Sequence, residues 1–200
     1  VRTAQSQSII VSDDGTGTAV TQSGNQFTVE QGSLSSDGAN LFHSFEQFSL
    51  TSQETATFVA QPSVQNILAR VTGGAPSYLN GLLEISQSGD AQSALFLMNP
   101  AGILFGTDAR LNLPGSLTAT TADGIAVGSN LFSADFSHGL EPSQGWFDAL
   151  GENSYSSLIG DPTGEFSFLS AHPGSVVNEG ELSVPAGESL TLMGGTVVNT

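Results

Sequence analysis

The sequence contains no cysteine and no lysine, and its only basic side chains besides histidine are Arg2, Arg70 and Arg110. The absence of cysteine excludes disulfides, thiolate zinc sites and a cysteine nucleophile. With 19 Asp and Glu residues, the formal net charge is −16, which repels nucleic-acid phosphates and anionic lipid headgroups. We therefore expect neither nucleic acid nor a membrane surface among the partners of this chain.

Long apolar runs and catalytic motifs are also missing. No run of about 18 apolar residues occurs, so we expect no membrane insertion. Neither a zinc-protease, a serine-hydrolase, a Walker nor a Rossmann pattern occurs. The histidines His43, His138 and His172 do not have the spacing of metal ligands. We expect no catalytic residue, metal or cofactor, and we interpret His43, between Phe42 and Ser44, as a structural histidine with satisfied hydrogen bonds.

Residues that favour turns are abundant instead. The chain has 24 Gly and 8 Pro, and only 11% of its residues are charged. Short β-branched and aromatic segments at 8–11, 18–21 and 26–29 predict a small antiparallel cap. Segment 40–50 is predicted to be extended. Further short apolar runs are separated by Gly, Pro, Asn and Asp, and lie at 64–71, 82–85, 95–98, 103–105, 111–113 and 117–121. Strands this short, with this spacing, indicate the coils of a solenoid.

An internal repeat near the end of the sequence supports this interpretation. Residues 174–178 recur as residues 195–199, a spacing of 21 residues. Segments 182–184 and 189–192 lie between them, so each period is predicted to hold about three short strands, as in one turn of a parallel β-helix. Asn178 and Asn199 share the same phase of the repeat, and we expect their side chains to stack as a ladder.

One region breaks the pattern. Residues 131–168 contain the single tryptophan, Trp146, and the run 146–150 could form a helical turn. We predict an excursion from the solenoid, with its aromatic side chains packed on the flank. The expected fold is therefore all-β, a right-handed parallel β-helix in one domain spanning 1–200. Its expected parts are cap strands at 1–35, coils at 36–130, the excursion at 131–168, and coils at 169–200 that continue into a passenger.

Residues 99–106 predict a tight corner. Asn99 followed by Pro100 favours a turn, and Pro100 removes one backbone donor. Gly102 permits a positive φ, and Ile103 returns the chain to a strand. We place this corner between two coils.

These segments resemble a known family. Residues 99–106 are similar to the Asn-Pro-Asn-Gly-Ile signature of the two-partner secretion (TPS) domain, also called the filamentous haemagglutinin N-terminal domain, although Ala101 stands at the second Asn. Segments 40–48, 64–74 and 115–125 resemble other marked segments of the family in the same order. Residues 155–164 look like its cyanobacterial branch.

The resemblance implies a function. It implies a TpsA-type exoprotein that reaches the periplasm and is bound there by the POTRA domains of an outer-membrane TpsB-type β-barrel transporter, so that the passenger is secreted to the cell surface. We expect the domain to be a monomer. The residues to which the resemblance assigns partner recognition are Asn99, Pro100, Gly102 and Ile103, and those of the second signature segment are Asn40, Leu41, Phe42, His43, Phe45 and Phe48.

Two other classes stay open at this point. The domain could be an adhesive, haemagglutinin-like module that binds surfaces through the aromatic segment around Trp146. It could also be a β-helix polysaccharide lyase. Lyases of this kind need Lys or Arg to stabilise a developing carboxylate anion, and this chain offers only Arg70 and Arg110 in its interior.

Overall fold

The computed structural model describes residues 8–134 and 154–200, and their strands form four sheets, A to D. Sheet A contains β1 (Ile9–Val11), β5 (Asn40–Phe48), β7 (Asn66–Val71), β10 (Ala94–Met98), β13 (Leu117–Thr120) and β18 (Leu190–Met193), and the short β4 (Ser33–Leu34) pairs with β5. Sheet B contains β2 (Thr18–Ser23), β3 (Gln26–Gln31), β6 (Thr55–Ala60), β9 (Leu82–Gln87) and β12 (Arg110–Asn112).

Two smaller sheets complete the fold. Sheet C contains β8 (Ser77–Leu79), β11 (Ile103–Phe105), β17 (Ser175–Asn178) and β19 (Thr196–Asn199). Sheet D contains β14 (Gly124–Val127), β15 (Asn130–Ser133) and β16 (Pro162–Ser167). The described residues also include the 3-10 turn η2 (Ser154–Ser157). None of their helical segments has the length and apolar character that crossing a membrane requires.

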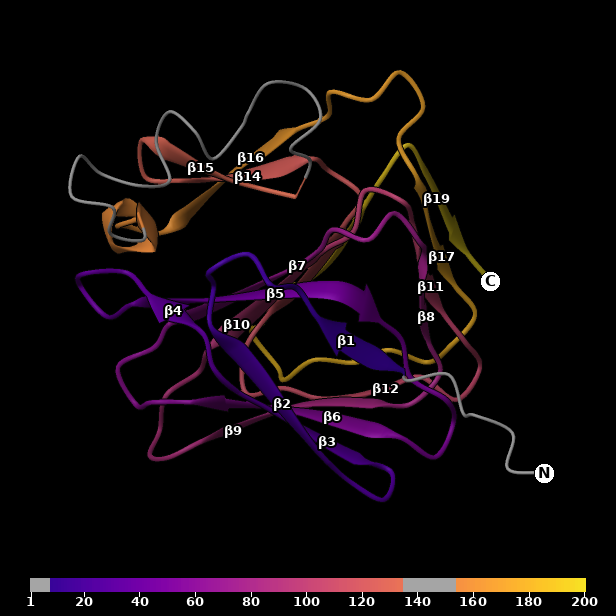
Figure 1. Cartoon of the computed structure of the whole chain (residues 1–200). Helices are drawn as coiled ribbons and strands as arrows, with labels where there is room; N and C mark the ends of the chain where they lie inside the picture. The colour runs from indigo at the N-terminus through magenta and orange to yellow at the C-terminus, as the bar shows by residue number, and fades with distance from the viewer. Residues whose placement is uncertain (1–7, 135–153) are drawn as a thin grey trace.

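The coils visit sheets A, C and B in turn. β7, β8 and β9 form one coil, and β10, β11 and β12 form the next, each strand pairing in parallel with its counterpart. Figure 1 shows the three sheets around a common interior, with sheet D outside sheet A. Short strands separated by Gly and Pro turns cannot form long hairpins, so they stack as coils. The predicted fold, a right-handed parallel β-helix, is confirmed.

The predicted antiparallel cap is confirmed as well. β1 pairs antiparallel with β5, and β2 and β3 form an antiparallel hairpin. Gly24 occupies the hairpin turn with a φ of 60°, a left-handed conformation that favours glycine. β3 then pairs in parallel with β6, so the cap leads directly into sheet B.

Inward side chains stack in rows across successive coils. One row of sheet A joins Leu41, Ile67, Leu95 and Leu117 by register, and each of these side chains is at most 5% exposed. The core near the cap is aromatic instead, and contains Phe27, Phe45, Phe48 and Phe58. Each buried side chain of this size stabilises the fold by about 1.5–3 kcal/mol relative to an exposed one.

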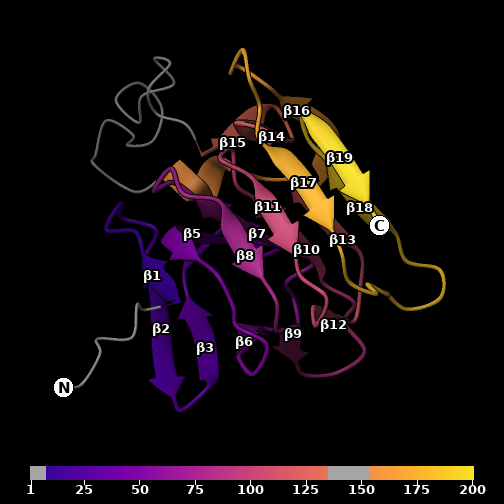
Figure 2. The ribbon, with the colours of Figure 1, turned by 90° about the vertical axis from the view of Figure 1, so that its right-hand side faces the viewer.

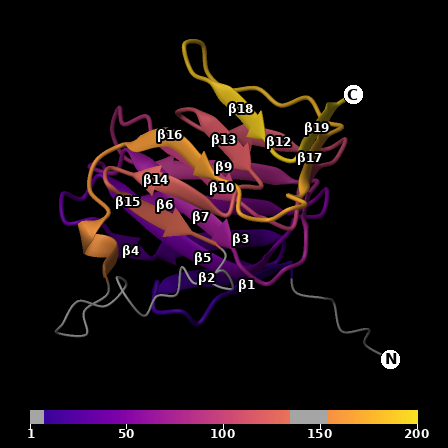
Figure 3. The ribbon, with the colours of Figure 1, turned by 90° about the horizontal axis from the view of Figure 1, so that it is seen from above.

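Sheet D is the predicted excursion. It lies between β13 and β17 in the chain, and Figure 3, from above, shows it lying across β5, β7 and β10. Its strands begin at Gly124, earlier than the predicted limit of 131. Phe132 and Tyr155 pack against Phe42 on the outer face of sheet A, with ring centroids 5.1 and 5.4 Å from that of Phe42. The predicted helical turn at 146–150, and the adhesive site around Trp146, lie outside the described residues.

The repeat at 174–178 and 195–199 gives the predicted ladder but not the predicted strand count. β17 and β19 pair in register, and Asn178 Nδ2 donates to Asn199 Oδ1 at 2.7 Å. The strand predicted at 182–184 is wrong, because this segment forms no ladder. Leu182 and Val184 still pack on the core. Pro185 follows directly and lacks the amide that would continue a ladder.

His43 is a buried structural residue as predicted, but the prediction that its hydrogen bonds are satisfied was wrong. The side chain is buried, but both ring nitrogens lack a hydrogen-bond partner. The register explains this, because His43 lies in an inward row with Ala69, and its ring centroid is 5.6 Å from that of Phe58. Burial lowers the pKa of His43 to about 4, so the imidazole is neutral at pH 7.

Candidate functional site

The Asn99 corner, residues 99–102, turns the chain from β10 to β11. Asn99 is fully buried, and its Nδ2 donates to the carbonyl of Ala75 at 3.0 Å and to Ser77 Oγ at 2.9 Å. Its Oδ1 accepts a 3.0 Å hydrogen bond from the Ala101 amide, which closes the turn. The corner therefore joins sheets A and C within one coil, and our expectation of a corner between two coils was wrong. The side chain of Asn99 nevertheless ties this coil to the preceding one.

Gly102 shows the positive φ that the sequence predicted. Its φ is 131°, which L side chains rarely adopt, and an added Cβ would lie 3.4 Å from the Ser175 carbonyl oxygen. Ile103 is 1% exposed and belongs to the core. Pro100 and Ala101 are only partly buried. In the folded domain, a partner can therefore contact this corner mainly through Pro100 and Ala101.

All six residues of the second signature segment are buried in β5. Asn40 is the polar member of this set that connects other elements. Its Nδ2 donates to the carbonyl oxygens of Leu158 at 3.0 Å and Gly160 at 2.8 Å, and its Oδ1 accepts from Asn66 Nδ2 at 2.9 Å. Asn40 therefore joins two coils to the excursion. A partner could contact these six side chains only where the segment is not yet folded.

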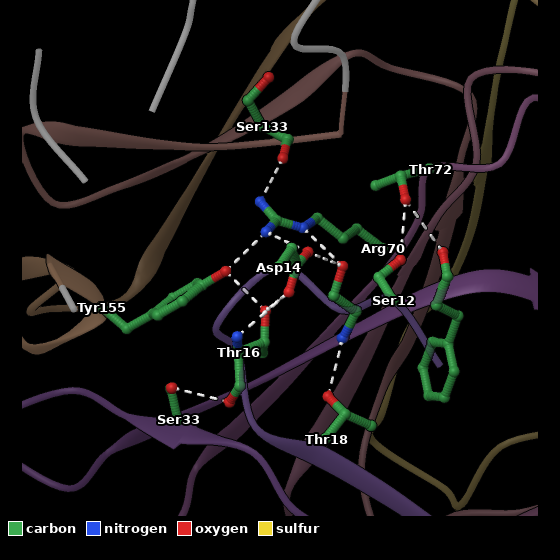
Figure 4. Close-up of polar contacts among 11 residues, drawn as sticks. Ser12, Asp14, Thr16, Thr18, Ser33, Arg70, Thr72, Ser133 and Tyr155 are labelled. Atoms are coloured by element: carbon green, nitrogen blue, oxygen red, sulfur yellow. Dashed lines mark hydrogen bonds and ion pairs between the residues drawn. The ribbon is translucent and has the colours of Figure 1, made fainter. Parts of the chain in front are cut away.

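The Arg70 junction, which sequence reasoning did not assign, connects three parts of the fold (Figure 4). Arg70 lies in β7 and is 1% exposed. Its Nη2 lies 2.9 Å from Asp14 Oδ2 of the cap and also donates to Tyr155 Oη. Its Nη1 donates to the Ser133 carbonyl at 2.6 Å, and its Nε donates to Ser44 Oγ at 3.0 Å. One buried cation thus holds the cap, the coils and the excursion together.

An aromatic ring and shifted pKa values also determine the electrostatics of the Arg70 junction. The Arg70 guanidinium lies 4.9 Å from the ring centroid of Phe132, a cation–π distance. Burial raises the pKa of Asp14, but hydrogen bonds from Ser44 and Thr16, together with the Arg70 charge, outweigh burial, and the net pKa is lowered. Burial raises the pKa of Tyr155. At neutral pH the junction therefore contains one cation, one carboxylate and a neutral phenol.

A single sequence signal could have pointed to this junction. Arg70 interrupts the apolar run 64–71, where a charge is rarely buried without a partner. In the described part of the chain, no group of three or more His, Asp or Glu side chains could hold a metal ion.

We expect Asn99→Ala to lower the free energy of unfolding by about 1–3 kcal/mol, since it leaves the Ala75 carbonyl and the Ala101 amide without their side-chain partner. Urea unfolding followed by circular dichroism measures this. Asn112→Ala, at an exposed position of β12, is the matched control and is expected to change stability by less than about 0.5 kcal/mol. Equal midpoints for the two variants would mean that the Asn99 contacts do not support the corner.

Two solved structures of secretion domains have the same architecture as this chain. The chain aligns with the crystal structure of the HMW1 secretion domain from Haemophilus influenzae at 22% identity and a TM-score of 0.55, covering 96% of this chain and 40% of that one. It aligns with the filamentous hemagglutinin secretion domain at 19% identity and a TM-score of 0.56, covering 96% of this chain and 55% of that one. The class defined by the fold is therefore a parallel β-helical domain with the architecture of these two structures.

The family model resolves the class further. Residues 8–200 match the TPS secretion domain. The chain belongs to the TPS secretion domain family, as the signature corner and the order of the marked segments predicted. No curated protein matches the chain. A TPS secretion domain belongs to an exoprotein, and this family membership points to secretion.

Proposed function

We propose that this domain directs export of a large exoprotein by binding the periplasmic POTRA domains of a TpsB-type outer-membrane transporter. The observation that carries the proposal is the family match over residues 8–200, which includes the Asn99 corner. The domain acts as a recognition module and not as an enzyme. The passenger follows it through the transporter to the cell surface.

The structure supports two stages of recognition. Before folding, the β5 segment is accessible and could pair with a strand edge of a POTRA sheet by β-augmentation. After folding, its six signature side chains are buried, while Pro100 and Ala101 of the corner keep part of their surface. Folding would then withdraw the second signature segment, in β5, from the transporter and leave the corner in place.

Binding to the POTRA region of the transporter from the same organism tests this function. We expect wild-type domain to bind, and we expect a double variant, Asn99→Ala with Pro100→Ala, to bind at least about tenfold more weakly. The measurement is biolayer interferometry with folded protein and with protein held in urea, under conditions where the variant still gives a β-rich circular dichroism spectrum.

Ser93→Ala is the matched control for this experiment. Ser93 is buried at the opposite end of β10, and its Oγ donates to the Val64 carbonyl at 2.6 Å. The control therefore also removes a buried corner hydrogen bond between coils, but far from the signature along the strand. Equal losses of binding in both variants would attribute the effect to stability. No binding by wild-type protein, folded or in urea, would overturn the export function.

A further inference from the structure

One outward row of sheet A, around Phe42, is apolar and covered. Phe42, Leu68 and Phe96 lie in one row by register. They pack beneath Phe132 and Tyr155 of the excursion in one apolar cluster. An apolar row on the outside of this β-helix is thus matched by an element that covers it, as burial of apolar surface requires.

The outward side chains of sheet B need no cover. Thr28, Thr57, Glu84 and Asn112 form the central row by register. Thr57 Oγ1 donates to Glu84 Oε1 at 2.6 Å, and Asn112 Nδ2 donates to Glu84 Oε2 at 3.3 Å. This polar row is typical of a sheet face in contact with water.

Sheet C differs from both. Tyr78, Leu104, Val177 and Val198 lie in one outward row by register, which we call the sheet C row. Tyr78 is 47% and Val198 is 40% exposed, and the other two are partly buried. Figure 2 shows sheet C facing the viewer with no other described element in front of it. Among the described residues, the sheet C row is thus an apolar face without the cover that sheet A has.

One border of the row, at the C-terminal ends of the sheet C strands, is acidic. Asp108 lies in the turn after β11, and Glu179 and Glu181 follow β17, all three exposed. Arg110 follows Asp108 at the start of β12 and is the only basic residue of the chain between Arg70 and its end, apart from histidine. An acidic border attracts a surface whose own border carries Lys and Arg.

The negative charge of the domain also decides which partner could cover the sheet C row. A second copy would bring the same acidic border and the same net charge of −16 against itself, which opposes self-association. Anionic lipid is repelled for the same reason. Leu104 of the row lies two residues after Gly102, so the row is continuous with the Asn99 corner.

We propose that the sheet C row, Tyr78, Leu104, Val177 and Val198, is the surface with which the folded domain docks onto a protein partner that has an apolar centre and a basic border. This inference rests on the proposed function, and it names the periplasmic region of the transporter as that partner. The corner and the row together then form one contact surface across successive coils.

The test is the affinity of folded domain for the transporter's periplasmic region. The double variant Leu104→Thr with Val177→Thr places β-branched threonine, which favours strands, at both positions but removes apolar surface at the centre of the row. We expect its Kd to rise at least about tenfold, as for loss of central apolar contacts. The matched control is Val11→Thr with Val59→Thr, at positions that are 37% and 39% exposed on sheets A and B, and it is expected to bind within about twofold of wild type.

The role of the acidic border is tested by the rate at which the domain associates with the transporter's periplasmic region. We expect Asp108→Asn with Glu179→Gln to slow association and to flatten its dependence on salt concentration, while dissociation changes little. An association rate and salt dependence equal to those of wild type would remove the charge argument for this partner.

The outcomes separate the inference from the function on which it rests. Wild-type binding that the Leu104, Val177 variant retains overturns the docking surface and leaves the export function standing. Binding by unfolded protein alone also overturns the docking surface and leaves the export function standing. No binding in either state overturns both. Sedimentation of wild-type domain as a dimer, lost in the Leu104, Val177 variant, would replace the transporter by a second copy as the occupant.

Discussion

Replacing Arg70 with methionine is expected to lower the free energy of unfolding by about 3 kcal/mol, one of the two largest effects among our predictions. The guanidinium is buried and contacts the cap through Asp14, the coils through Ser44 and the excursion through Ser133 and Tyr155. Methionine fills part of the volume but donates no hydrogen bond. The Asp14 carboxylate would lose its cation, and the Ser133 carbonyl would lose a buried donor.

Urea unfolding measured by circular dichroism and by tyrosine fluorescence checks this prediction. Arg110→Met is the matched control, because Arg110 is exposed on β12, and we expect it to cost less than about 0.5 kcal/mol. Adding Asp14→Asn to Arg70→Met removes the unpaired charge and is expected to recover part of the loss. An Arg70→Met domain as stable as the Arg110→Met domain would show that the junction contributes no net stability.

The junction has a consequence for folding order. The hydrogen bond between Thr16 Oγ1 and Tyr155 Oη joins residues 139 positions apart. A contact of this sequence separation forms only after the intervening chain is available, and closing so long a loop costs entropy. The cap of this domain therefore reaches its full stability only once the excursion has folded onto sheet A.

The second large effect concerns pH. Lowering the pH from 7.5 to 5 is expected to reduce the free energy of unfolding by about 2 kcal/mol through His43 alone. The pKa of His43 is about 4 in the folded domain, below the ordinary value of 6.5. The unfolded chain binds the proton more readily, so this contribution is complete above pH 6.5 and is lost as the pH falls toward 4. Asp14 acts in the same direction in more acidic solution, because its pKa is lowered too.

His43→Leu isolates this contribution. Leucine removes two buried nitrogens that lack partners, so we expect the variant to be at least as stable as wild type at pH 7.5, with an advantage that grows by about 2 kcal/mol at pH 5. His172→Leu is the control, since His172 is exposed. Thermal melts across this pH range give the comparison. Parallel pH profiles for wild type and His43→Leu would mean that His43 is hydrated or paired in solution.

Features set by neighbouring residues were predictable from the sequence. The short apolar runs between turn residues predicted the strands of the coils. The β propensity of a run and the turn residues at its two ends determine where a strand begins and ends. Asn99, Pro100 and Gly102 predicted a corner with a positive φ, which is a property of the local backbone. The repeat of 21 residues predicted the pairing of Asn178 with Asn199, because equal spacing gives equal phase in a solenoid.

Features set by contacts between distant segments were decided only by the tertiary structure. The partners of Arg70, the lack of partners for His43 and the apolar row on sheet C all depend on how coils register with one another and on where the excursion lies. Composition and periodicity place a residue in a strand, but do not say which face of which sheet remains uncovered. The sequence by itself thus determined the β-helix, its corner and its family, while only the packing of cap, coils and excursion decided which charge is buried and which apolar face is left open.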